Sequence, residues 1–481
     1  MRKLLSVLFI AALPLHCLGA DAAWQVAPAA HATEVPVDTP LRIVFDRAPP
    51  APGAGSVRIF RAADGVMVDE LRAGEDVDSI GHAQQEYKRV VRYTPITVRE
   101  TTATIRLHSA KLDYDTEYTV MVDSSVFGNA VIAPWTFRTR AAPPAGNNLT
   151  VDDAGPADFR TPQGALNHAM RTLPRATAVS INIANGRYDQ LLYLRGKDNV
   201  TLHGESRDGV VLEATNNDGI NPGTGAGRGP RSPAANGGRS VFLIEDADMV
   251  TLDNLTLVNN TVRAQSKGGQ AETLVFNNDR GRLVARNASF FSEQDTIQVK
   301  GYSWFHRTLI AGNVDFIWGG ARAALFEDSE IRTVGDSAQP TGGGYIVQAR
   351  TVAASEPGFV FLDSRLTHGP GPLGNDVPAG KSYLARQGPP TTWDSVSFIR
   401  CRMDRHIAAQ GWAPTKPETP EATPGAGWGE FGSMDLGGRT LDVSQRTPGH
   451  QLTAQQVAAR FGSRQLIFKS FNNGQGWNPT P

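Results

Sequence analysis

Hydrophobic and polar residues alternate with a period of two in the first third of the chain. Short stretches with this pattern span residues 41–45, 56–60 and 102–107. This period places successive side chains on opposite faces, which predicts half-buried β-strands. We therefore predict a small β-sandwich domain over residues 24–140, followed by a linker at 141–147 that is rich in Ala, Pro, Gly and Asn.

A different pattern begins after the linker. Apolar residues with the spacing of one helix face predict a helix from Thr161 to about Leu173. Beyond it the chain reads as strands and turns, and six-residue segments of similar pattern recur. These segments are Ala285–Phe290, Phe305–Ile310, Phe326–Ile331, Phe361–Leu366 and Phe398–Met403.

The spacing of these segments suits a parallel β-helix. The first two steps are 20 and 21 residues, about one coil, and neighbouring coils stack at about 4.8 Å. The later steps of 35 and 37 residues indicate coils with inserted loops. We predict an all-β chain with a β-helix over residues 148–481, capped at its N-terminal end by the helix. Periodicity alone leaves an ordinary sandwich with irregular strands as the alternative.

Composition and charge narrow the possibilities. The 481 residues include 49 Gly and 31 Pro, which favours turns and short strands over helices. The formal net charge of −1 argues against nucleic acid as the main partner. Residues 216–239 are rich in Gly, Pro and Asn, but no Lys-Ser/Thr follows as in a phosphate-binding loop, so we predict a long surface loop.

The N-terminus has the pattern of an export signal. Two basic residues precede an apolar run at 4–13, with small residues behind it, which predicts a signal peptide over residues 1–22. The run is too short to span a bilayer. A lipoprotein acylated at Cys17 is the alternative, although His16 stands where a small residue is expected. After cleavage Cys401 would be the only cysteine, so we expect a secreted or periplasmic protein without an intramolecular disulfide or a membrane span.

Three short segments with polar residues lie about one predicted coil apart. They are Gly269–Leu274, Glu293–Ile297 and Gly312–Gly319. If each spans one turn, Gln270, Gln294, Asp295 and Asp315 are neighbours on one face. Two carboxylates and two amide donors can hydrolyse an ester without a metal, because they supply a nucleophile, a proton donor and an oxyanion site. The alternative is that these residues cap turns between strands, and spacing alone does not decide.

The residues themselves resemble the signatures of the pectin methylesterase family. Gln294-Asp295-Thr296 resembles its Gln-Asp-Thr motif, and 314–319 resembles its Asp-Phe-Ile-Phe-Gly motif with Trp318 as the second aromatic. Weaker matches occur at Gly186–Gln190, Gly344–Ala349, Tyr383–Arg386, Met403–Ile407 and Gly411-Trp412. The resemblance covers about residues 148 to 481 and implies a right-handed parallel β-helix.

The resemblance also implies a role for five residues. Asp315 matches the nucleophile that forms an acyl-enzyme, and Asp295 matches the acid that protonates methanol and then activates water. Gln270 and Gln294 match the oxyanion donors. Arg386 matches the guanidinium that holds the nucleophile ionised and oriented. The implied reaction is hydrolysis of the methyl esters of polygalacturonate (pectin), with no metal and no other cofactor.

Two departures from the family concern the sugar site. Residues 384–388 read Leu-Ala-Arg-Gln-Gly where the family has Leu-Gly-Arg-Pro-Trp, so a tryptophan that helps wall the site is missing, and Gln190 replaces a common glutamate. We predict a long, open groove lined by Trp318, Tyr345 and Trp412 that accepts several galacturonate units.

The N-terminal domain resembles bacterial immunoglobulin-like domains in its late strands, over residues 112–120 and 134–138. We expect a separate sandwich whose deletion leaves the active-site residues in place. Spacer, wall anchor and dimer surface stay open as its role, and we expect a monomer.

Other functions fit the sequence less well. A serine esterase would need Gly-x-Ser-x-Gly and a zinc enzyme His-Glu-x-x-His or paired cysteines, and the chain has none of these motifs. A β-helix lyase usually needs clustered carboxylates for calcium, and the carboxylates of this chain are separated by the esterase motifs. Two alternatives stay open: a related hydrolase for another ester or thioester, against which Asp295 and Asp315 argue, and a non-catalytic pectin-binding surface protein.

Overall fold

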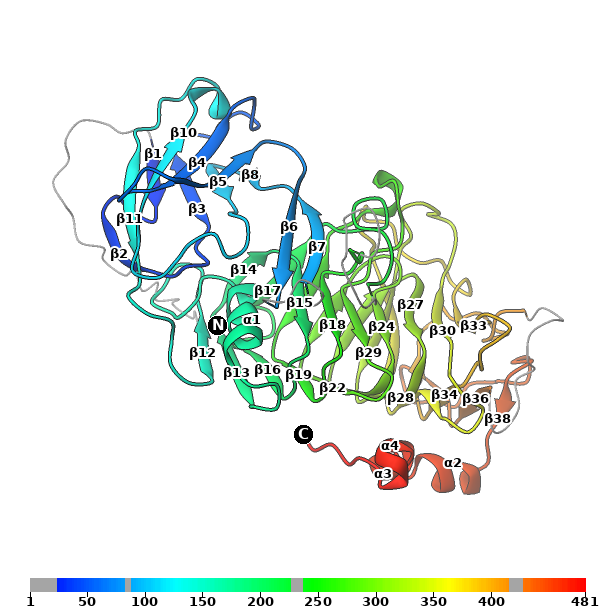
Figure 1. Cartoon of the computed structure of the whole chain (residues 1–481). Coiled ribbons are helices and arrows are strands. Elements are labelled where there is room, and N and C mark those ends of the chain that lie inside the picture. The colour runs from blue at the N-terminus through cyan, green and yellow to red at the C-terminus, as the bar shows by residue number, and fades with distance from the viewer. Residues whose placement is uncertain (1–23, 83–87, 226–236, 415–426) are drawn as a thin grey trace, which may run out of the picture.

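The computed structural model describes residues 24–82, 88–225, 237–414 and 427–481 (Figure 1). It contains an N-terminal β-sandwich and a right-handed parallel β-helix, which confirms the predicted fold class. The predicted signal peptide and Cys17 lie outside the described residues. Within them, no helix combines the length and the apolar character needed to cross a membrane.

The N-terminal sandwich has two sheets that enclose one apolar core. The first sheet consists of β1 (Trp24–Ala27), β3 (Leu41–Phe45), β9 (Thr102–Ile105) and β8 (Ile96–Arg99). The second consists of β2 (Ala32–Val35), β11 (Trp135–Thr139), β10 (Glu117–Val122), β4 (Ser56–Arg61) and β5 (Met67–Arg72), and the short helix η2 (Ser124–Phe127) follows β10. The alternating strands predicted from the sequence match β3, β4 and β9. The immunoglobulin-like character of this domain stays a prediction.

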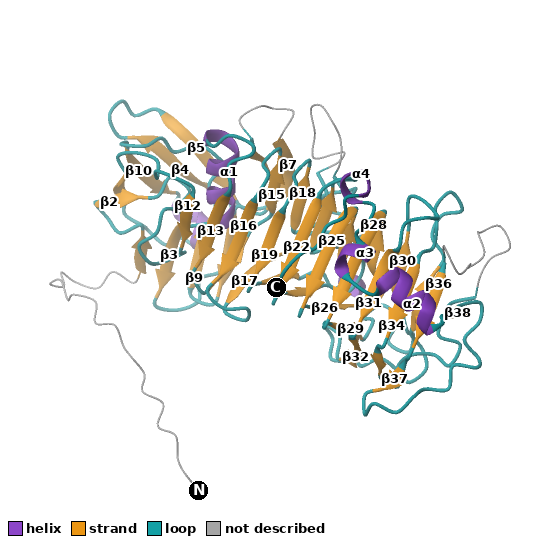
Figure 2. Cartoon of the chain, turned by 90° about the horizontal axis from the view of Figure 1, so that it is seen from below, coloured by secondary structure: helices purple, strands orange, loops and turns teal. Residues whose placement is uncertain are grey.

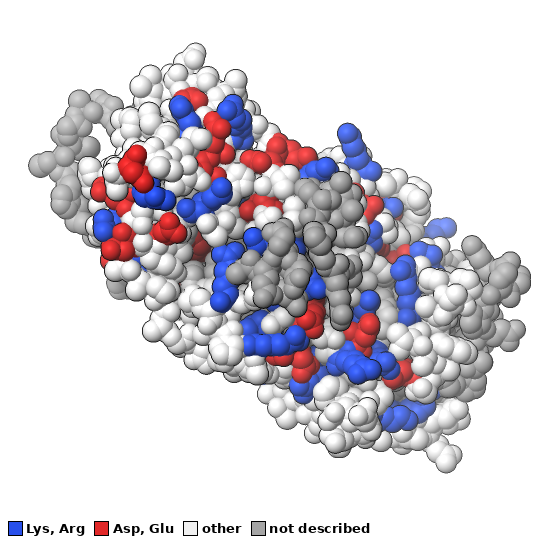
Figure 3. Space-filling view, viewed as in Figure 1, with Lys and Arg blue, Asp and Glu red and all other residues white. Residues whose placement is uncertain are grey.

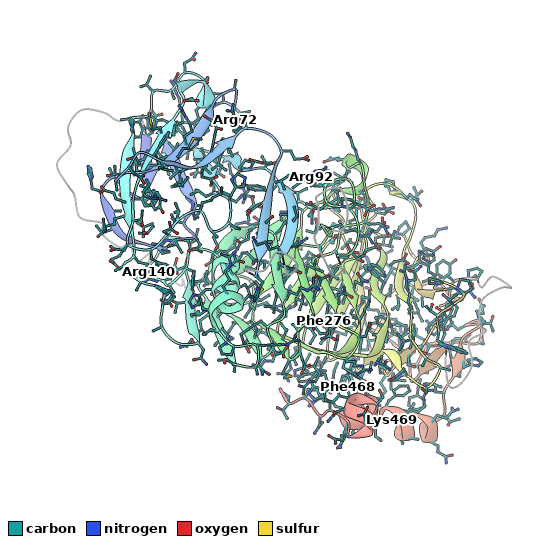
Figure 4. All side chains as sticks on the ribbon, viewed as in Figure 1. Arg72, Arg92, Arg140, Phe276, Phe468 and Lys469 are labelled. Carbon is teal, nitrogen blue, oxygen red and sulfur yellow. The ribbon has the colours of Figure 1, made fainter. Side chains whose placement is uncertain are left out.

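A two-stranded hairpin leaves the sandwich and reaches the β-helix. Strands β6 (Asp76–Gly81) and β7 (Lys88–Tyr93) pair antiparallel and run beside β15 (Leu192–Arg195) of the β-helix in Figure 1. Figure 4 labels Arg92 on this hairpin, where the two domains meet. The sequence pattern did not indicate that the N-terminal domain extends over the helical coils.

The coils of the β-helix form three parallel sheets in the described residues. The eleven-stranded sheet has the order β12 (Asn148–Val151), β13 (Val179–Ile183), β16 (Val200–Gly204), β19 (Val250–Asp253), β22 (Arg282–Arg286), β25 (Gly301–His306), β28 (Ala321–Glu327), β31 (Gly358–Leu362), β34 (Val396–Ile399), β36 (Trp428–Phe431), β38 (His450–Gln451). The nine-stranded sheet has the order β14 (Gly186–Asp189), β17 (Val210–Ala214), β20 (Thr256–Asn259), β23 (Ser289–Phe291), β26 (Leu309–Gly312), β29 (Glu330–Val334), β32 (Arg365–Gly369), β35 (Arg402–Met403), β37 (Met434–Asp435). The seven-stranded sheet has the order β15 (Leu192–Arg195), β18 (Phe242–Glu245), β21 (Leu274–Asn277), β24 (Ile297–Val299), β27 (Val314–Gly319), β30 (Tyr345–Ala349), β33 (Tyr383–Arg386).

The recurring six-residue segments mark the corner between the eleven- and nine-stranded sheets. Their first residues pair in register across one sheet and their last residues across the other. Inside the coils, the four Phe rings that begin segments stack with centroids 4.7, 4.6 and 4.4 Å apart. The longer steps hold loops at 335–344 and 370–382, each directly before a strand of the seven-stranded sheet. The prediction that each repeat forms one coil is therefore confirmed.

Each corner is turned by one residue in the left-handed region. These residues are Asn287, Arg307, Asp328, Asp363 and Arg400, with φ between 48° and 54°. Arg and Asp at successive corners pair, as in Arg307–Asp328 at 3.1 Å and Arg400–Asp363 at 2.7 Å. These pairs are exposed and contribute little stability. Acidic and basic side chains are interspersed over the described surface in Figure 3.

Helix α1 (Pro162–Thr172) confirms the predicted cap. Thr161 ends the preceding extended segment, and its hydroxyl accepts from the backbone N–H of Gly164 at 3.0 Å. Pro162 occupies the first turn, where its missing N–H costs nothing. The apolar face of α1 packs into the same core as the first coils, so it shields the open end of the β-helix.

Three C-terminal helices and the short η3 (Arg263–Gln265) were not predicted. Helices α2 (Ala454–Phe461), α3 (Arg464–Ile467) and α4 (Phe471–Gly474) follow the last strand and pack on the outer face of the eleven-stranded sheet (Figure 2). The sequence carried a signal for α2, because Thr453 and Gln456 form a reciprocal capping box.

Candidate active site

The two aspartates lie on adjacent coils at the edge of the seven-stranded sheet. The backbone N–H of Asp295 donates to the carbonyl of Val314 at 3.0 Å, so the coil of Asp295 is hydrogen-bonded to the coil of Asp315 next to the two side chains. Asp295 has φ 61° and Asp315 has φ 48°, a conformation that Asp tolerates better than most residues. The pairing of β27 with β30 shifts register around Asp315, so it sits in a bulge of the kind that re-aims side chains at active sites.

Arg386 holds Asp315 by a two-pronged contact. Arg386 ends β33 and reaches back past β30, where its Nε donates to Oδ1 of Asp315 at 2.7 Å and its Nη2 donates to Oδ2. The pKa of Arg386 is raised, chiefly by the hydrogen bond to Asp315. Two parallel N–H···O bonds stabilise the anionic carboxylate and fix its plane. The structure therefore brings together the predicted nucleophile and the predicted arginine.

Asp295 has a different environment. Its Oδ2 accepts from Nε2 of Gln270 at 3.0 Å and from Nη2 of Arg239 at 3.2 Å, and its side chain is only 5% exposed. The Nε of Arg239 also donates to both oxygens of Glu272, at 3.0 and 2.9 Å, and Glu272 is fully buried. One guanidinium therefore faces two buried carboxyl groups.

This arrangement favours the neutral acid form of Asp295. Burial raises the pKa of Asp295 well above its ordinary value, and the charges of Glu272 and Asp315 raise it further, while Arg239 opposes them. Burial also raises the pKa of Glu272. Burial alone would lower the pKa of Arg239, but attraction to Glu272 and Asp295 raises it instead. The two aspartates are thus placed to work in different protonation states.

The orientation of Gln270 is fixed by its neighbours. Its Oε1 accepts from Nη1 of Arg239 at 2.7 Å, so its Nε2 points to Asp295 and one N–H of the amide is left for an oxyanion. Gln294 is half-buried beside Gly269, where a Cβ would come within 2.9 Å of its Oε1. Gln270 therefore contacts Asp295, whereas Gln294 directly precedes Asp295 in the chain and its role as an oxyanion donor stays a prediction.

The aromatic residues correct the prediction of an open aromatic groove. The prediction that Trp412 lines the groove is wrong, because Trp412 is 1% exposed and its ring stacks on Trp428 inside the coils, with centroids 5.2 Å apart. Trp318 is 4% exposed, and the guanidinium of Arg350 lies 4.4 Å from its ring centroid. Tyr345 is only partly buried, with Arg386 over its ring at 5.4 Å. These three rings therefore offer a bound sugar less exposed apolar surface than the sequence predicted.

The tight packing of the backbone at Gly388 explains in part why the family's tryptophan is missing from this position. A Cβ at Gly388 would lie 2.2 Å from the carbonyl oxygen of Ala349. Its N–H donates to Oδ1 of Asp394 at 2.8 Å, and burial raises the pKa of Asp394 to about 6. The backbone at this position is pressed against the neighbouring coil, so a larger residue does not fit without a shift.

One row of side chains runs across the outer face of the seven-stranded sheet. In register from one strand to the next they are Tyr193, Leu243, Val275, Gln298, Trp318, Gln348 and Arg386. The first three are fully buried and form one apolar cluster with Ile80 of the hairpin. The last four lie on the coils beside the aspartates.

Sequence reasoning missed Arg239, Glu272 and Arg350. Glu272 carried a signal, because it is an acidic residue two positions after Gln270 at the start of a buried strand, where it needs a cation. Arg239 ends the stretch 216–239 that was predicted as a surface loop. The described ends of that stretch are partly buried instead, with Arg239 6% exposed.

No group of three or more His, Cys, Asp or Glu side chains arranged to hold a metal ion occurs in the described ranges of the chain. The positive charges at the site come from Arg239, Arg350 and Arg386. The site combines a guanidinium-bound carboxylate, a buried carboxyl group and amide donors.

Comparison with known proteins agrees with this geometry. A family model described as Pectinesterase matches residues 148–470. The chain is similar to Pectinesterase 2 of Olea europaea, with 26% identity over 343 residues that cover 68% of this chain and 81% of that protein. It is also similar to Pectinesterase A of Dickeya chrysanthemi, with 29% identity over 265 residues that cover 49% and 68% of the two chains.

Solved structures give the same result. One is a mutant pectin methylesterase in complex with a hexasaccharide, with 25% identity and a TM-score of 0.55 over 70% of this chain and 100% of that chain. Another is the pectin methylesterase from Yersinia enterocolitica, with 27% identity and a TM-score of 0.50 over 65% of this chain and 100% of that one. The family match begins where the sandwich and linker end.

Proposed function

The chain belongs to the pectinesterase family, and from this membership and its paired aspartates we propose that it hydrolyses the methyl esters of pectin, releasing methanol and leaving free carboxylates. The observation that carries the proposal is the pairing of an arginine-bound Asp315 with a buried Asp295 one coil away. One group is arranged as an anion and the other as an acid, and such a pair can cleave an ester without a metal.

The first chemical step forms an acyl-enzyme. An oxygen of Asp315 attacks the ester carbonyl carbon, and the developing oxyanion accepts hydrogen bonds from Gln270 and Gln294. The bond between the carbonyl carbon and the methoxy oxygen then breaks. Asp295 gives its proton to that oxygen, so methanol leaves and a mixed anhydride joins the substrate to Asp315.

The second step releases the product. Asp295 is now ionised and takes a proton from water, whose oxygen attacks the substrate carbonyl carbon. The anhydride bond breaks, Asp315 leaves as a carboxylate under Arg386, and Asp295 again carries its proton. Water supplies the hydroxyl group on the product and the proton that Asp295 regains, so the cycle needs no further reactant.

The function is tested by incubating the purified protein with highly methylated pectin and measuring methanol, free carboxylate and unsaturated chain ends. We expect methanol and carboxylate in equal amounts and no unsaturated ends. Unsaturated ends would identify a lyase, and the absence of all three products would favour a binding protein.

Arg386→Lys tests the contact to Asp315. Lysine keeps the charge but has a single nitrogen, so it loses one of the two parallel hydrogen bonds and the fixed plane. We expect turnover to fall by about 10²-fold, the scale of removing one oriented donor from a catalytic site. Steady-state rates on methylated pectin measure it. Near wild-type turnover would show that charge alone is enough at this position.

The remaining expectations are proposals of location and assembly. A signal peptide and a pectin substrate agree with action outside the cytoplasm, and we propose export on that basis. We also propose a monomer, which light scattering of the purified protein tests.

A further inference from the structure

The hairpin of the N-terminal domain inserts a fully buried arginine between the two domains. Arg89 lies on β7 and is 0% exposed. Its guanidinium donates to the carbonyl oxygens of Gly237 at 2.8 Å, Gly238 at 2.7 Å and Ser240 at 2.6 Å. It also donates to the carbonyls of Leu192 at 2.8 Å and Val241 at 3.4 Å. All five carbonyls belong to the β-helix.

Four of these carbonyls, at positions 237, 238, 240 and 241, flank Arg239 in the chain. Carbonyls that point toward one side need donors there, and a guanidinium with five N–H groups supplies them. The backbone of β7 closes on the same segment, because a Cβ at Gly237 would lie 2.8 Å from the carbonyl of Val90. The N-terminal domain therefore fixes the backbone from which Arg239 extends.

The other end of Arg239 is in the catalytic site. It orients Gln270 by the contact to Oε1 at 2.7 Å and reaches Oδ2 of Asp295 at 3.2 Å. We propose that Arg89 is a positioning residue for the active site, acting through Arg239, so that the N-terminal domain is part of the catalytic unit. This replaces the expectation that the domain could be deleted without moving the active-site residues.

A matched control exists at the same interface. Arg42 also joins the sandwich to the β-helix, donating to the carbonyl of Asp153 at 2.8 Å and to its Oδ2 at 2.9 Å. Asp153 follows the first strand of the β-helix, away from the segment that carries Arg239. Arg89→Met and Arg42→Met each remove one arginine between the domains, and only the first touches the support of Arg239.

The test compares both variants on methylated pectin across pH. For Arg89→Met we expect kcat to fall about tenfold or more, because small displacements of catalytic groups are costly. Since Arg239 lowers the pKa of Asp295, its displacement should move the alkaline limb of kcat/KM to higher pH. Arg42→Met should stay within about twofold with an unchanged profile, as expected for a change away from the site. Equal behaviour of the two variants would overturn the proposal.

Two additions keep the test decisive. If Arg89→Met does not fold, Arg89→Lys, with three donors in place of five, should change the profile in the same direction, and a wild-type profile would overturn the proposal. Hydrogen exchange of the peptide covering residues 237–245 should be faster in the Arg89 variants than in Arg42→Met. That measurement does not need pectin hydrolysis, so the contact of Arg89 with the segment around Arg239 is tested even if the proposed function fails.

The hairpin also covers part of the outer face of the seven-stranded sheet, on separate evidence. Ile80 forms one buried apolar cluster with Tyr193, Leu243 and Val275, the first three positions of the row across the seven-stranded sheet. Gly225 and Gly238 lie over Leu243 as well, so the hairpin and this loop cover these positions together. Gln298, the next position, lies three residues after Asp295. The aspartates therefore stand directly beside the covered coils. On their other side, the row continues over coils that the hairpin does not cover, where Trp318 and Gln348 are 4% and 7% exposed and Arg386 is partly buried.

We infer from this cover that the enzyme acts at or near one end of a methylated galacturonan chain. The inference rests on the proposed function. A chain that is bound along the row can extend over the coils of Trp318, Gln348 and Arg386, but in the other direction it meets the hairpin. A unit in the middle of a long chain reaches the aspartates only if the chain leaves the surface.

A fully methylated hexagalacturonide with one labelled end tests this inference. After brief treatment with wild-type protein, mass spectrometric fragmentation locates the first free carboxylate. We expect it on the terminal unit or its neighbour at one end. Carboxylates that are spread evenly, or that appear first in the centre, would overturn the chain-end inference while supporting the esterase function. The chain-end inference would also be overturned if the hexamer stayed fully methylated while methylated pectin was hydrolysed. If neither substrate released methanol, the proposed function itself would fail.

Discussion

Asp315→Asn is expected to abolish ester hydrolysis almost completely while leaving the fold and pectin binding in place. Asn has nearly the same size as Asp but its amide is a poor nucleophile, so the covalent step is lost. We expect turnover to fall by about four orders of magnitude or more, the scale of removing a group that acts on the reaction path. Methanol release from methylated pectin measures the loss, and thermal unfolding checks the fold.

Asp363→Asn is a closely matched control. Asp363 has φ 52° and accepts from Nε and Nη2 of Arg400, both at 2.7 Å, so it repeats the geometry of the Asp315 and Arg386 pair away from the site. We expect this variant to keep wild-type activity. Robust methanol release by Asp315→Asn, after deamidation to Asp is excluded by mass, would contradict the nucleophile assignment.

Asp295→Asn is expected to separate the two chemical steps. The variant keeps the attacking carboxylate but has no proton for methoxide, so hydrolysis of methyl esters should fall by about 10²- to 10⁴-fold. A galacturonate ester of a phenol with a good leaving group needs little protonation, so its first step should persist. Deacylation still lacks its base, and we expect a burst of phenol followed by slow turnover. Equal losses on both esters would contradict the role of Asp295 as acid.

The same variant has an expected effect on stability. The folded-state pKa of Asp295 is raised, so the folded protein holds this proton more tightly than the unfolded chain does, and stability falls as pH rises through the folded-state pKa. Asn carries no charge at any pH. Asp295→Asn should therefore raise the melting temperature relative to wild type at neutral and alkaline pH, and less in acid. Active-site charges commonly carry such a cost in stability.

Local patterns predicted the coils and the catalytic pair. The aromatic and apolar residues that begin and end each segment repeat because each coil presents the same positions to the same core. Asp295 and Asp315 could be found because each lies in a short motif of consecutive residues. One coil of separation in sequence then placed them side by side.

Contacts between distant segments were not predictable in this way. Arg239 and Glu272 are 33 residues apart, and Arg89 lies 103 to 152 residues before the carbonyls it binds. Neither contact leaves a periodic or local signal. The stretch 216–239 reads as a surface loop by composition, yet its described ends are held between the domains, where Asn216 and Asn221 are fully buried.

The aromatic residues show a related limit. A tryptophan near a catalytic motif suggests a sugar platform, but composition does not tell which way its side chain points. The ring of Trp412 lies against that of Phe398 in a tilted arrangement, with centroids 6.0 Å apart, and stacks on Trp428, so it belongs to the core. Trp318 lies in the row across the seven-stranded sheet, and Arg350 covers its ring.

The most direct test of the account is the position of the acyl group. The Asp295→Asn protein is mixed with the activated galacturonate ester and quenched with hydroxylamine, which converts an acylated aspartate into a hydroxamate that survives digestion. Peptide mass spectrometry then locates the modified residue. The account predicts the hydroxamate at Asp315. A hydroxamate at a different residue, or a burst of phenol with no modified aspartate, would contradict it.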